Sequence, residues 1–394
     1  MTSKSPPANP LGLAEAIKRA QAREEGKLNV VAHNGSAILG GAERALIRLL
    51  AGLQQRGHRV SLACNHDVVA DEAARSLVPV IIQPLRGDLV FGDALAFAKF
   101  LKRESPDALI VGTFKKVWLA GMAARRAKVE RVVARVGLSS DVARRWKYRT
   151  ALQRWVDTVV LNADAMRPAF ERSVPKFDPA DIVTIHTGVR APRTKQGPAA
   201  FRTGVGIAPD ARVIGTVARL SRQKRLERLI EAAQHLPDVH VVIAGEGTER
   251  ARLEGLRDSL KLADRVHLIG ETRDVGDVLA ALDVFVLTSD QEGMSNAMLE
   301  ALALGVPVVS TRVSGAGEAL APIDGDAPGV VTGFEPAEIA GAIRTLLQDP
   351  ARLDSARLAA LRASAERFSH DRMLDDWETL LRDGPAALQR SRVA

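Results

Sequence analysis

Short runs rich in valine and isoleucine alternate with helical patterns along most of the chain, and this alternation starts twice. In the first half, the expected strands are residues 28–33, 59–64, 78–82, 108–111, 131–136, 158–162 and 182–185. In the second half, they are residues 212–218, 239–244, 266–269, 284–287, 306–310 and 329–332. Helical patterns such as residues 43–55 and 94–102 separate them. This order predicts parallel α/β sheets, because two parallel strands need a crossover segment between them.

The chain is too long for one compact core. Its 394 residues are 46% hydrophobic, which predicts two domains of ordinary size. Residues 190–209 contain three prolines among polar residues, a composition typical of a linker. We therefore expect one Rossmann-like domain in residues 1–195, a second in residues 196–369 and a separate terminal segment in residues 370–394. Two doubly wound parallel sheets of this kind would face each other across a cleft.

Glu292 and Glu300 lie eight residues apart in the sequence SDQEGMSNAMLEALALG, where a strand pattern gives way to an apolar helix. In a doubly wound sheet, ligands bind where strands end and helices begin. Ser295 and Asn296 are candidate caps for this helix. The free backbone N–H groups of its first turn, together with the helix dipole, would favour an anion such as a phosphate.

Two functional interpretations of this carboxylate pair compete. On one regular helix the two residues would be about 12 Å apart, since each residue rises 1.5 Å. A retaining glycosidase needs its carboxyl groups only about 5 Å apart. Alternatively, Glu292 lies in the loop and Glu300 in the helix, so that each binds a different part of a long ligand such as a nucleotide sugar. Two solvated surface acids would also fit the spacing, because the motif alone is weak.

Other loops carry residues suited to phosphate binding. Gly40 and Gly41 follow the first expected strand and open a helix, where they would allow a ligand to approach the backbone. Arg219 and Lys224 lie between a strand and a helix, where two fixed cations suit a leaving diphosphate. Gly245 lies in a similar turn after a strand. Each feature could instead be a tight structural turn or a surface charge.

Cysteine content and hydropathy exclude several classes of protein. The single cysteine, Cys64, excludes a disulfide framework and a cysteine zinc site and favours a reducing compartment. The first 27 residues lack the apolar core of a signal peptide. No uncharged apolar stretch reaches 18 residues, so we expect no membrane span and a cytoplasmic location.

The basic charge is concentrated in the first half. Residues 1–195 carry 32 Lys and Arg against 18 Asp and Glu, whereas residues 196–394 carry 23 against 29. Between Lys115 and Arg154 there are twelve basic residues and two acidic ones. Five aromatic residues lie in or beside this segment: Phe114, Trp118, Trp146, Tyr148 and Trp155. The combination fits an anionic membrane surface; nucleic acid or solvent could contact the same residues.

The order of these motifs resembles that of the large family of retaining GT-B glycosyltransferases, the group 1 and family 4-like enzymes with an E-x7-E motif. The resemblance covers most of the chain. It rests on GGAE at residues 40–43, GTVARLSRQK at 215–224, AGEG at 244–247, E-x7-E at 292–300, GVPVVST at 305–311 and GAGE at 315–318.

The resemblance implies a role for each matching position. Arg219 and Lys224 would bind the donor diphosphate, and Glu292 would contact the hydroxyls of the transferred sugar. Glu300 would hold the ribose hydroxyls. The remaining donor contacts would come from Gly40, Gly41, Gly245, Gly293, Met294 and Ser295. The last helix, from Asp371 to Leu381, would cross back to the first domain.

The resemblance also implies chemistry without a metal or other cofactor. The chain has no D-x-D motif at a strand end, and fixed cations and helix dipoles would stabilise the diphosphate. Retention would then proceed by front-face attack, with the departing phosphate taking the acceptor proton. One departure affects the acceptor side. Many family members have a histidine after the fifth strand, where this chain has Gly137, Ser139, Ser140 and Asp141, and His33 is a weak substitute.

The sequence therefore predicts a cytoplasmic glycosyltransferase, peripherally associated with the inner face of the membrane. It would move a sugar from a nucleotide diphosphate sugar to a lipid-linked or envelope-glycan acceptor resembling lipopolysaccharide. A nucleotide-sugar epimerase is the alternative enzyme, although it would not need the basic aromatic segment. A catalytically silent protein that binds nucleotide sugars or polyanions is the third reading. The acidic second half argues against nucleic acid.

Overall fold

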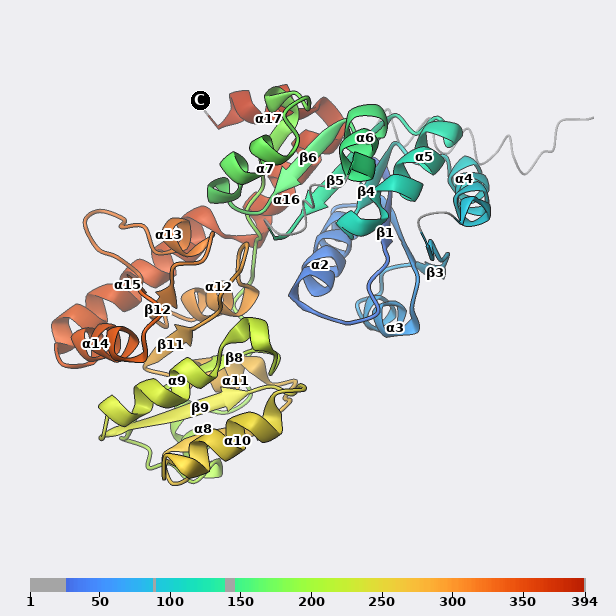
Figure 1. Cartoon of the computed structure of the whole chain (residues 1–394). Helices are drawn as coiled ribbons and strands as arrows, with labels where there is room; N and C mark the ends of the chain where they lie inside the picture. The colour runs from blue at the N-terminus through green and yellow to red at the C-terminus, as the bar shows by residue number, and fades with distance from the viewer. Residues whose placement is uncertain (1–25, 88–89, 139–145, 393–394) are drawn as a thin grey trace, which may run out of the picture.

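The computed structural model describes residues 26–87, 90–138 and 146–392, which form two α/β domains (Figure 1). The first domain contains a seven-stranded parallel sheet in the order β3-β2-β1-β4-β5-β6-β7. Its strands are β1 (Asn29–Asn34), β2 (Arg59–Cys64), β3 (Val80–Ile82), β4 (Ala108–Val111), β5 (Arg131–Val136), β6 (Thr158–Leu161) and β7 (Ile182–Thr184). The predicted parallel α/β class is thus confirmed.

Helices cover both faces of this sheet. They are α2 (Gly41–Gln55), α3 (Asp67–Arg75), α4 (Phe91–Glu104), α5 (Val117–Ala127), α6 (Trp146–Trp155) and α7 (Arg167–Ser173), with 3-10 turns at Phe114–Lys116, Asp164–Met166 and Pro179–Asp181. Successive side chains of a strand point to opposite faces of the sheet, so alternate residues pack against the helices on one face or the other. On β5, Val132 and Ala134 pack in the core with α4, α5 and α6, whereas Val133 packs in the core with α2.

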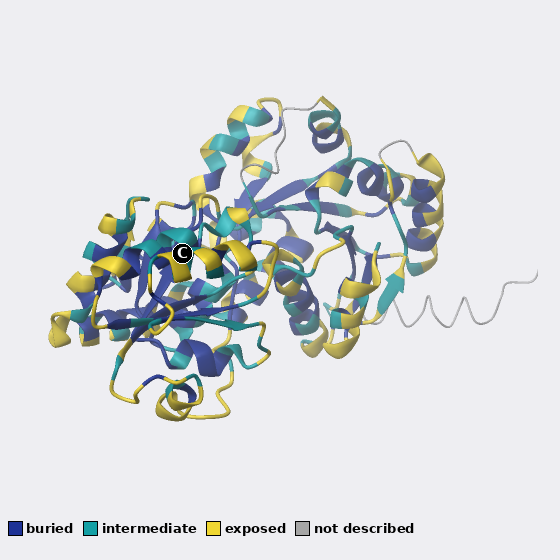
Figure 2. Cartoon of the chain, turned by 60° about the horizontal axis from the view of Figure 1, so that its bottom comes forward, coloured by how far each residue is buried: buried dark blue, intermediate teal, exposed yellow. Residues whose placement is uncertain are grey.

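The second domain contains a six-stranded parallel sheet in the order β10-β9-β8-β11-β12-β13. Its strands are β8 (Arg212–Val217), β9 (Val239–Ala244), β10 (Val266–Gly270), β11 (Val284–Leu287), β12 (Val308–Thr311) and β13 (Gly329–Thr332). Its helices are α8 (Pro198–Gly204), α9 (Glu227–Ala232), α10 (Arg250–Ser259), α11 (Val275–Ala280), α12 (Asn296–Ala303), α13 (Ala316–Ala319), α14 (Pro336–Leu347) and α15 (Pro350–Arg367), with 3-10 turns at Arg222–Lys224 and Ala233–His235. Figure 2 shows the strands of both sheets largely buried under these helices.

Each sheet reverses its strand order once. In the first domain the reversal lies between β1 and β4, and in the second between β8 and β11. Loops that leave such a pair of strands diverge to opposite faces and leave a binding crevice at the carboxyl ends. The loop containing Gly40 and Gly41 follows β1, whereas Lys224 and Glu292 follow β8 and β11. The loop after β1 therefore lies at the strand reversal of the first sheet. The loops after β8 and β11 lie at the strand reversal of the second.

The linker predicted for residues 190–209 is too long. Pro198–Gly204 forms α8, which contacts α11 of the second domain. Proline suits the first turn of a helix because its missing N–H is not needed there. Phe201 and Ile207 are buried in the core, so the apolar residues outweigh the prolines and polar neighbours. Structured residues of the second domain begin inside the predicted linker.

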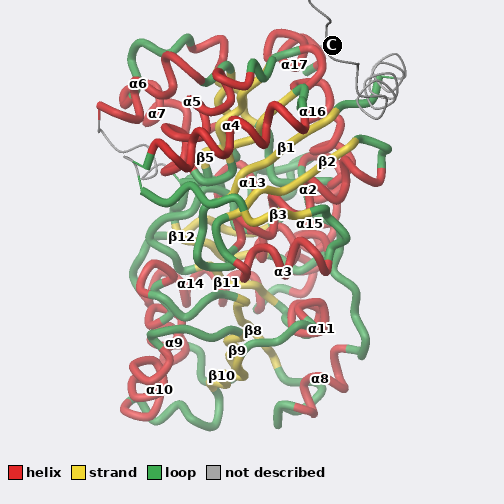
Figure 3. Tube along the Cα trace, turned by 90° about the vertical axis from the view of Figure 1, so that its right-hand side faces the viewer, coloured by secondary structure: helices red, strands yellow, loops and turns green. Residues whose placement is uncertain are grey.

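The chain passes between the domains twice, and the two passages lie side by side. The backbone N–H of Val189 donates to the carbonyl of Phe368, and that of His370 donates to the carbonyl of Val189. Beyond this bridge, α16 (His370–Asp383) packs against α2, and α17 (Pro385–Ser391) packs against α16. Figure 3 shows the two domains as separate groups of strands, with α16 and α17 at the end that contains β1 and β2.

None of the described helices is long and apolar enough to cross a lipid bilayer.

Candidate functional site

Glu292 lies in the loop between β11 and α12 and is held by two donors. The ammonium of Lys224 is ion-paired with its Oε1 atom, and the Ser289 hydroxyl donates to the same oxygen at 2.8 Å. The Glu292 side chain is only 10% exposed. Because both donors use Oε1, the second carboxylate oxygen is left to accept a hydrogen bond from a ligand hydroxyl.

Hydrogen bonds to backbone carbonyls hold the β8 and β11 loops together. The Thr288 hydroxyl donates to the carbonyl of Lys224 at 2.9 Å, and the Asp290 N–H donates to the carbonyl of Gln223 at 3.0 Å. The Gln223 side-chain amide donates to the carbonyl of Gln291 at 2.8 Å. The Lys224–Glu292 pair therefore lies on a braced pair of loops.

Arg219 differs from its basic neighbours. It is exposed, and its guanidinium has no hydrogen-bond or ion-pair partner in the described part of the chain. Arg222 is paired with Glu249 and Arg225 with Asp290, both at 3.5 Å, beside a hollow of 310 Å³. Arg219 therefore remains the cation of this loop that can turn to a bound diphosphate without breaking an ion pair.

Helix α12 begins as the sequence predicts. The Ser295 hydroxyl accepts a hydrogen bond from the N–H of Met298 at 3.4 Å, which makes Ser295 the N-cap. Asn296 is not the cap; its amide donates to the carbonyl of Gly41 in the first domain at 2.7 Å. The start of α2 therefore contacts the start of α12 across the junction of the two domains. Met294 is buried.

Gly293 lies directly against the first domain. A Cβ atom at this position would be 2.1 Å from the carbonyl oxygen of Gly137 and 2.4 Å from the Asn162 Oδ1 atom. Such distances are below any van der Waals contact, so only glycine fits here. Gly137 follows β5 and Asn162 follows β6. The loop of Glu292 therefore meets the carboxyl edge of the first sheet.

Glu300 lies on α12 and forms an ion pair with the first domain. Its Oε1 atom accepts a hydrogen bond from the Arg48 Nη1 atom of α2 at 2.7 Å. The side chains are 18% and 32% exposed, respectively. Glu292 thus lies in a loop and Glu300 on a helix, and the two carboxylates have different partners. This is the placement that the second interpretation of their spacing predicts.

The glycine loops show two kinds of close contact. Gly40 precedes α2, and its N–H donates to the Glu43 carboxylate at 2.9 Å. A Cβ atom on Gly41 would be 3.0 Å from the Asn296 amide. A Cβ atom on Gly245 would be 1.9 Å from the carbonyl oxygen of Ala218, so this glycine lets the β8 and β9 loops pack together. The donor contacts predicted for Gly40, Gly41 and Gly245 stay predictions.

The acceptor-side positions are only partly described. Ser139, Ser140 and Asp141 lie outside the described residues. His33 is fully buried, and its ring is 5.2 Å from that of Phe97. Burial lowers the pKa of His33 to about 4, and the charge of Lys116 adds to this effect. A neutral, enclosed imidazole of this kind belongs to the core.

Asn162 was not singled out from the sequence. Its amide donates weakly to the carbonyl of Gly137 at 3.4 Å, whereas its Oδ1 atom is buried without a partner among the described residues. This amide contacts the Gly293 position from the first domain. Its only sequence signal is a polar residue at the end of a strand.

The basic segment between Lys115 and Arg154 divides among several environments. Phe114 and Tyr148 are buried, and the Trp118 ring packs edge-on against Trp146 and Trp155. Trp146 itself is 71% exposed. The basic residues Lys115, Arg126, Lys128 and Arg154 are exposed as well. Residues 139–145, which include Arg144 and Arg145, lie outside the described residues.

A group of three potential metal ligands, Asp164, His186 and Glu318, bridges the domains. The His186 Nε2 atom lies 2.8 Å from a Glu318 oxygen, and the same carboxylate accepts the N–H groups of Asp164 and Ala165. Burial opposes the ionisation of Glu318, but His186 and the two N–H groups outweigh it and hold its pKa below the usual value. These contacts describe a hydrogen-bonded junction between domains.

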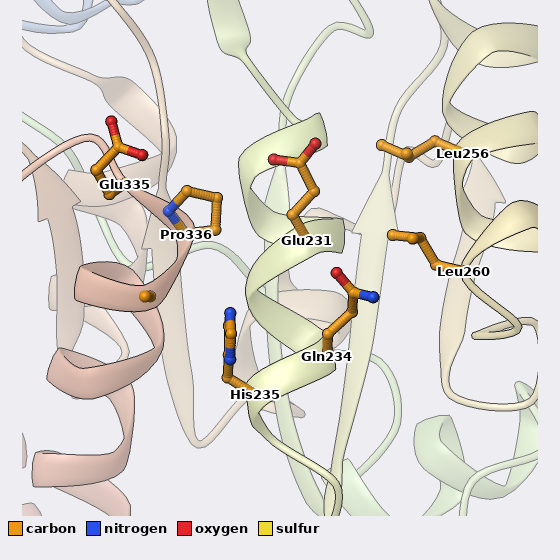
Figure 4. Close-up of a pocket in the computed structure, with 8 residues that line it drawn as sticks. Glu231, Gln234, His235, Leu256, Leu260, Glu335 and Pro336 are labelled. Atoms are coloured by element: carbon orange, nitrogen blue, oxygen red, sulfur yellow. The ribbon is translucent and has the colours of Figure 1, made fainter.

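A second hollow lies away from all of these residues. It has a volume of 340 Å³ and lies on the outer layer of the second domain between α9, α10 and α14. Figure 4 shows Glu231, Gln234, His235, Leu256, Leu260, Glu335 and Pro336 around it. No predicted site residue lines this hollow.

Two family models match separate parts of the chain. Residues 39–193 match Glycosyltransferase Family 4, and residues 199–363 match Glycosyl transferases group 1. The first match covers the first sheet from the Gly40 loop onward. The second covers every strand of the second sheet and the Glu292 loop.

Curated relatives share parts of the sequence. The lipopolysaccharide core biosynthesis glycosyltransferase LpsE of Rhizobium meliloti is 37% identical over 147 residues, which are 36% of this chain and 43% of that protein. LpsD of the same organism is 29% identical over 194 residues, 49% of this chain and 56% of that protein. The matched segments thus span about half the length of these relatives.

Solved structures share the fold over nearly the whole chain. The Anabaena protein HepE in complex with UDP and glucose superposes with a TM-score of 0.78 at 21% identity, over 90% of this chain and 99% of that one. The lipopolysaccharide outer core galactosyltransferase WaaB superposes with a TM-score of 0.64 at 16% identity, over 89% and 98% of the two chains. The two family matches together cover most of the chain and show that it belongs to the group 1 and family 4-like glycosyltransferases, with the GT-B fold that the solved structures share.

Proposed function

We propose that this protein is a retaining, metal-independent glycosyltransferase that uses a nucleotide diphosphate sugar and a lipid-linked or envelope-glycan acceptor. The observation that carries the proposal is the geometry of Glu292, whose Oε1 atom is held by Lys224 and Ser289. Its other oxygen can accept a sugar hydroxyl. The N–H groups at the start of α12 supply positive charge for phosphate oxygens nearby, and so does Arg219, which has no ion-pair partner among the described residues.

The proposed reaction breaks the bond between the anomeric carbon and the donor phosphate and forms one to the acceptor oxygen. Arg219 and Lys224 stabilise the negative charge that develops on the departing diphosphate. The acceptor proton moves to an oxygen of that phosphate, on the same face of the sugar. Glu292 orients the sugar hydroxyls during transfer. These two cations provide the stabilisation that a bound metal gives in other transferases.

The relatives support the donor and acceptor classes. HepE has been solved with UDP and with UDP-glucose, which supports a nucleoside diphosphate donor. LpsE and LpsD are named for lipopolysaccharide core biosynthesis, which supports an envelope-glycan acceptor here.

We also propose that the first domain binds the inner face of an anionic membrane through the segment between Lys115 and Arg154. Trp146 and the exposed bases of α5 and α6 combine an aromatic side chain with positive charge, as interfacial surfaces do. Helix α4 contacts α5 and adds exposed Phe91 and Leu95. The protein would then work from the cytoplasm on an acceptor held in the membrane.

A nucleotide-release assay tests the reaction. The protein is screened against uridine, guanosine and adenosine diphosphate sugars, with and without membrane extract. Turnover of one donor is expected, with losses of about 100-fold or more in Glu292→Ala and Lys224→Ala. Arg222→Ala is the matched control, because Arg222 is a cation of the same loop with a 91% exposed side chain. Unchanged turnover in both site variants would refute the assignment.

Vesicle flotation tests the membrane surface. The protein should float with phosphatidylglycerol vesicles at low salt and release as ionic strength rises, because surface charge is screened. Trp146→Ala should weaken flotation. Flotation that is equal on neutral vesicles, or insensitive to salt, would remove the membrane proposal while leaving the transfer reaction in place.

A further inference from the structure

Arg135 has an unusual position for a charged residue. It lies near the carboxyl end of β5, in the middle of the first sheet, and is half-buried. Residues two apart on a strand share a face. Arg135 therefore lies on the same face as Val133, which packs in the core with α2 and α16. Its guanidinium is directed to the side of the sheet on which α2 begins.

The charged neighbours of Arg135 are on α2. Glu43 attracts its charge and Arg48 repels it, and burial is the main reason that its pKa is lowered to about 10. Arg135 thus stays cationic at neutral pH. Glu43 already accepts the N–H of Gly40. No hydrogen bond or ion pair to the Arg135 guanidinium is found among residues 26–87, 90–138 and 146–392.

Arg48 also has guanidinium N–H donors without a hydrogen-bond partner among the described residues. Only its Nη1 atom is used, in the ion pair with Glu300 at 2.7 Å. Its Nε and Nη2 atoms are buried and have no partner among the described residues. A buried donor left without an acceptor is destabilising, so it needs a reason to persist. Two neighbouring guanidinium groups with unused donors are suited to bidentate recognition of phosphate oxygens.

We propose that Arg48 and Arg135 form a phosphate-binding subsite on the first-domain side of the junction, a deepening that rests on the proposed function. Glu300 holds Arg48 in place until a ligand hydroxyl engages that carboxylate. The phosphate can come from two sources, the donor diphosphate or a phosphorylated acceptor. Both present the same oxygens, and the experiment below separates them.

Binding of inorganic pyrophosphate and phosphate to the full chain is measured by isothermal titration calorimetry. Arg48→Met and Arg135→Met should each weaken pyrophosphate binding by about tenfold or more, the effect of losing one charge-assisted hydrogen bond. Glu300→Gln should bind at least as tightly as the parent protein, because the competing carboxylate is gone. Arg135→Lys should lose most of the affinity although its charge is retained, because the planar fork is lost.

Two matched controls remove the same charge elsewhere. Arg44 lies on α2 but is paired with Glu72, and Arg131 lies on β5 but contacts the carbonyl of Arg382. The controls are therefore Arg44→Met and Arg131→Met. Both should bind pyrophosphate within twofold of the parent protein, a range of roughly 0.4 kcal/mol. A loss in the controls equal to that in Arg48→Met and Arg135→Met would show a general charge effect and overturn the subsite.

UDP binding distinguishes the sources. If the donor supplies the phosphate, Arg135→Met weakens UDP binding by the same factor as pyrophosphate binding. If the acceptor supplies it, UDP binding is unchanged, but the protein saturated with UDP loses its affinity for inorganic phosphate in Arg135→Met. Parent-like binding of pyrophosphate, phosphate and UDP by folded Arg48→Met and Arg135→Lys would overturn the proposal. None of these binding measurements needs turnover. The subsite proposal can therefore fail while the transferase assay succeeds, and the transferase assay can fail while the subsite proposal holds.

Discussion

Lys224, in the loop after β8, is ion-paired with Glu292, in the loop after β11, across the strand reversal of the second sheet. The partners are 68 residues apart in sequence. The pairing joins the two loops into one structural unit. Ser289 completes the unit from the β11 side.

Removing either member of this pair should therefore cost as much as removing both. We expect Lys224→Ala, Glu292→Ala and the double variant to lower kcat to similar extents, about 100-fold or more, because residues that act together are not additive. Ser289→Ala should cost less, about tenfold, since Lys224 still holds the carboxylate. Steady-state kinetics with the donor found in the screen measures this. Losses that multiply in the double variant would show two independent roles.

Gly293→Ala should separate the two domains at the junction. Its new methyl group would lie 2.1 Å from the Gly137 carbonyl and 2.4 Å from the Asn162 amide, so the loops cannot keep their positions. We expect at least a tenfold loss of kcat with little change in unfolding temperature, because the clash lies in loops that follow β5, β6 and β11 and removes no buried side chain. Gly317→Ala is the matched control, since a Cβ atom there meets nothing within 4 Å. Full activity in Gly293→Ala would mean that the junction opens during turnover.

His33 should make the protein less stable as pH falls. Its folded pKa is about 4, against an ordinary 6.5, because the ring is buried. Between these values the unfolded chain binds a proton that the native chain does not, so stability present above pH 6.5 is lost progressively down to pH 4. The full loss is about 3 kcal/mol at 1.36 kcal/mol per pKa unit.

Urea unfolding of the parent protein and His33→Phe at pH 7 and pH 5 isolates this contribution. The parent should lose about 2 kcal/mol more than the variant between these pH values. The other histidines affect both proteins alike, so the difference belongs to His33. Equal losses would show that the ring is hydrated or paired in solution.

Trp377 should be the residue through which α16 stabilises the first domain. It is 2% exposed and packs in the core that contains α2 and the first sheet. Trp377→Ala should lower the free energy of unfolding by about 3–5 kcal/mol. Trp146→Ala changes the same residue type at a 71% exposed position and should cost less than about 0.5 kcal/mol. Chemical denaturation compares the two variants.

The elements whose sequence patterns are local could be predicted. Both sheets, the N-cap role of Ser295 and the loop position of Glu292 follow from signals within a few residues. Helix α8 could not be predicted as easily, because Pro198 and its polar neighbours conceal the buried Phe201. Proline at the first position of a helix is a start signal that the linker interpretation overlooked.

The junction between the domains could not be predicted from the sequence. Arg48 meets Glu300 across 252 residues, and His186 meets Glu318 across 132. Pairs so far apart in the sequence produce no periodic pattern. In the sequence, Arg48, Asn162 and His186 therefore look like ordinary polar residues. Arg135 is one of the twelve basic residues counted between Lys115 and Arg154, which fit a charged surface. Its position on β5 instead places it on the α2 side of the sheet. The roles assigned to the glycine loops also stay predictions.

The bridge between Val189 and Phe368 has a consequence for synthesis of the chain. The first domain is not one continuous stretch, because α16 and α17 supply Trp377, Leu380 and Leu388 to its core. A ribosome adds about 5–20 residues per second, so these residues leave it roughly ten to forty seconds after β7. During that interval α2 exposes the apolar surface that α16 later covers. The domain that is made first is therefore completed last, because α16 and α17 follow the whole of the second domain in the chain.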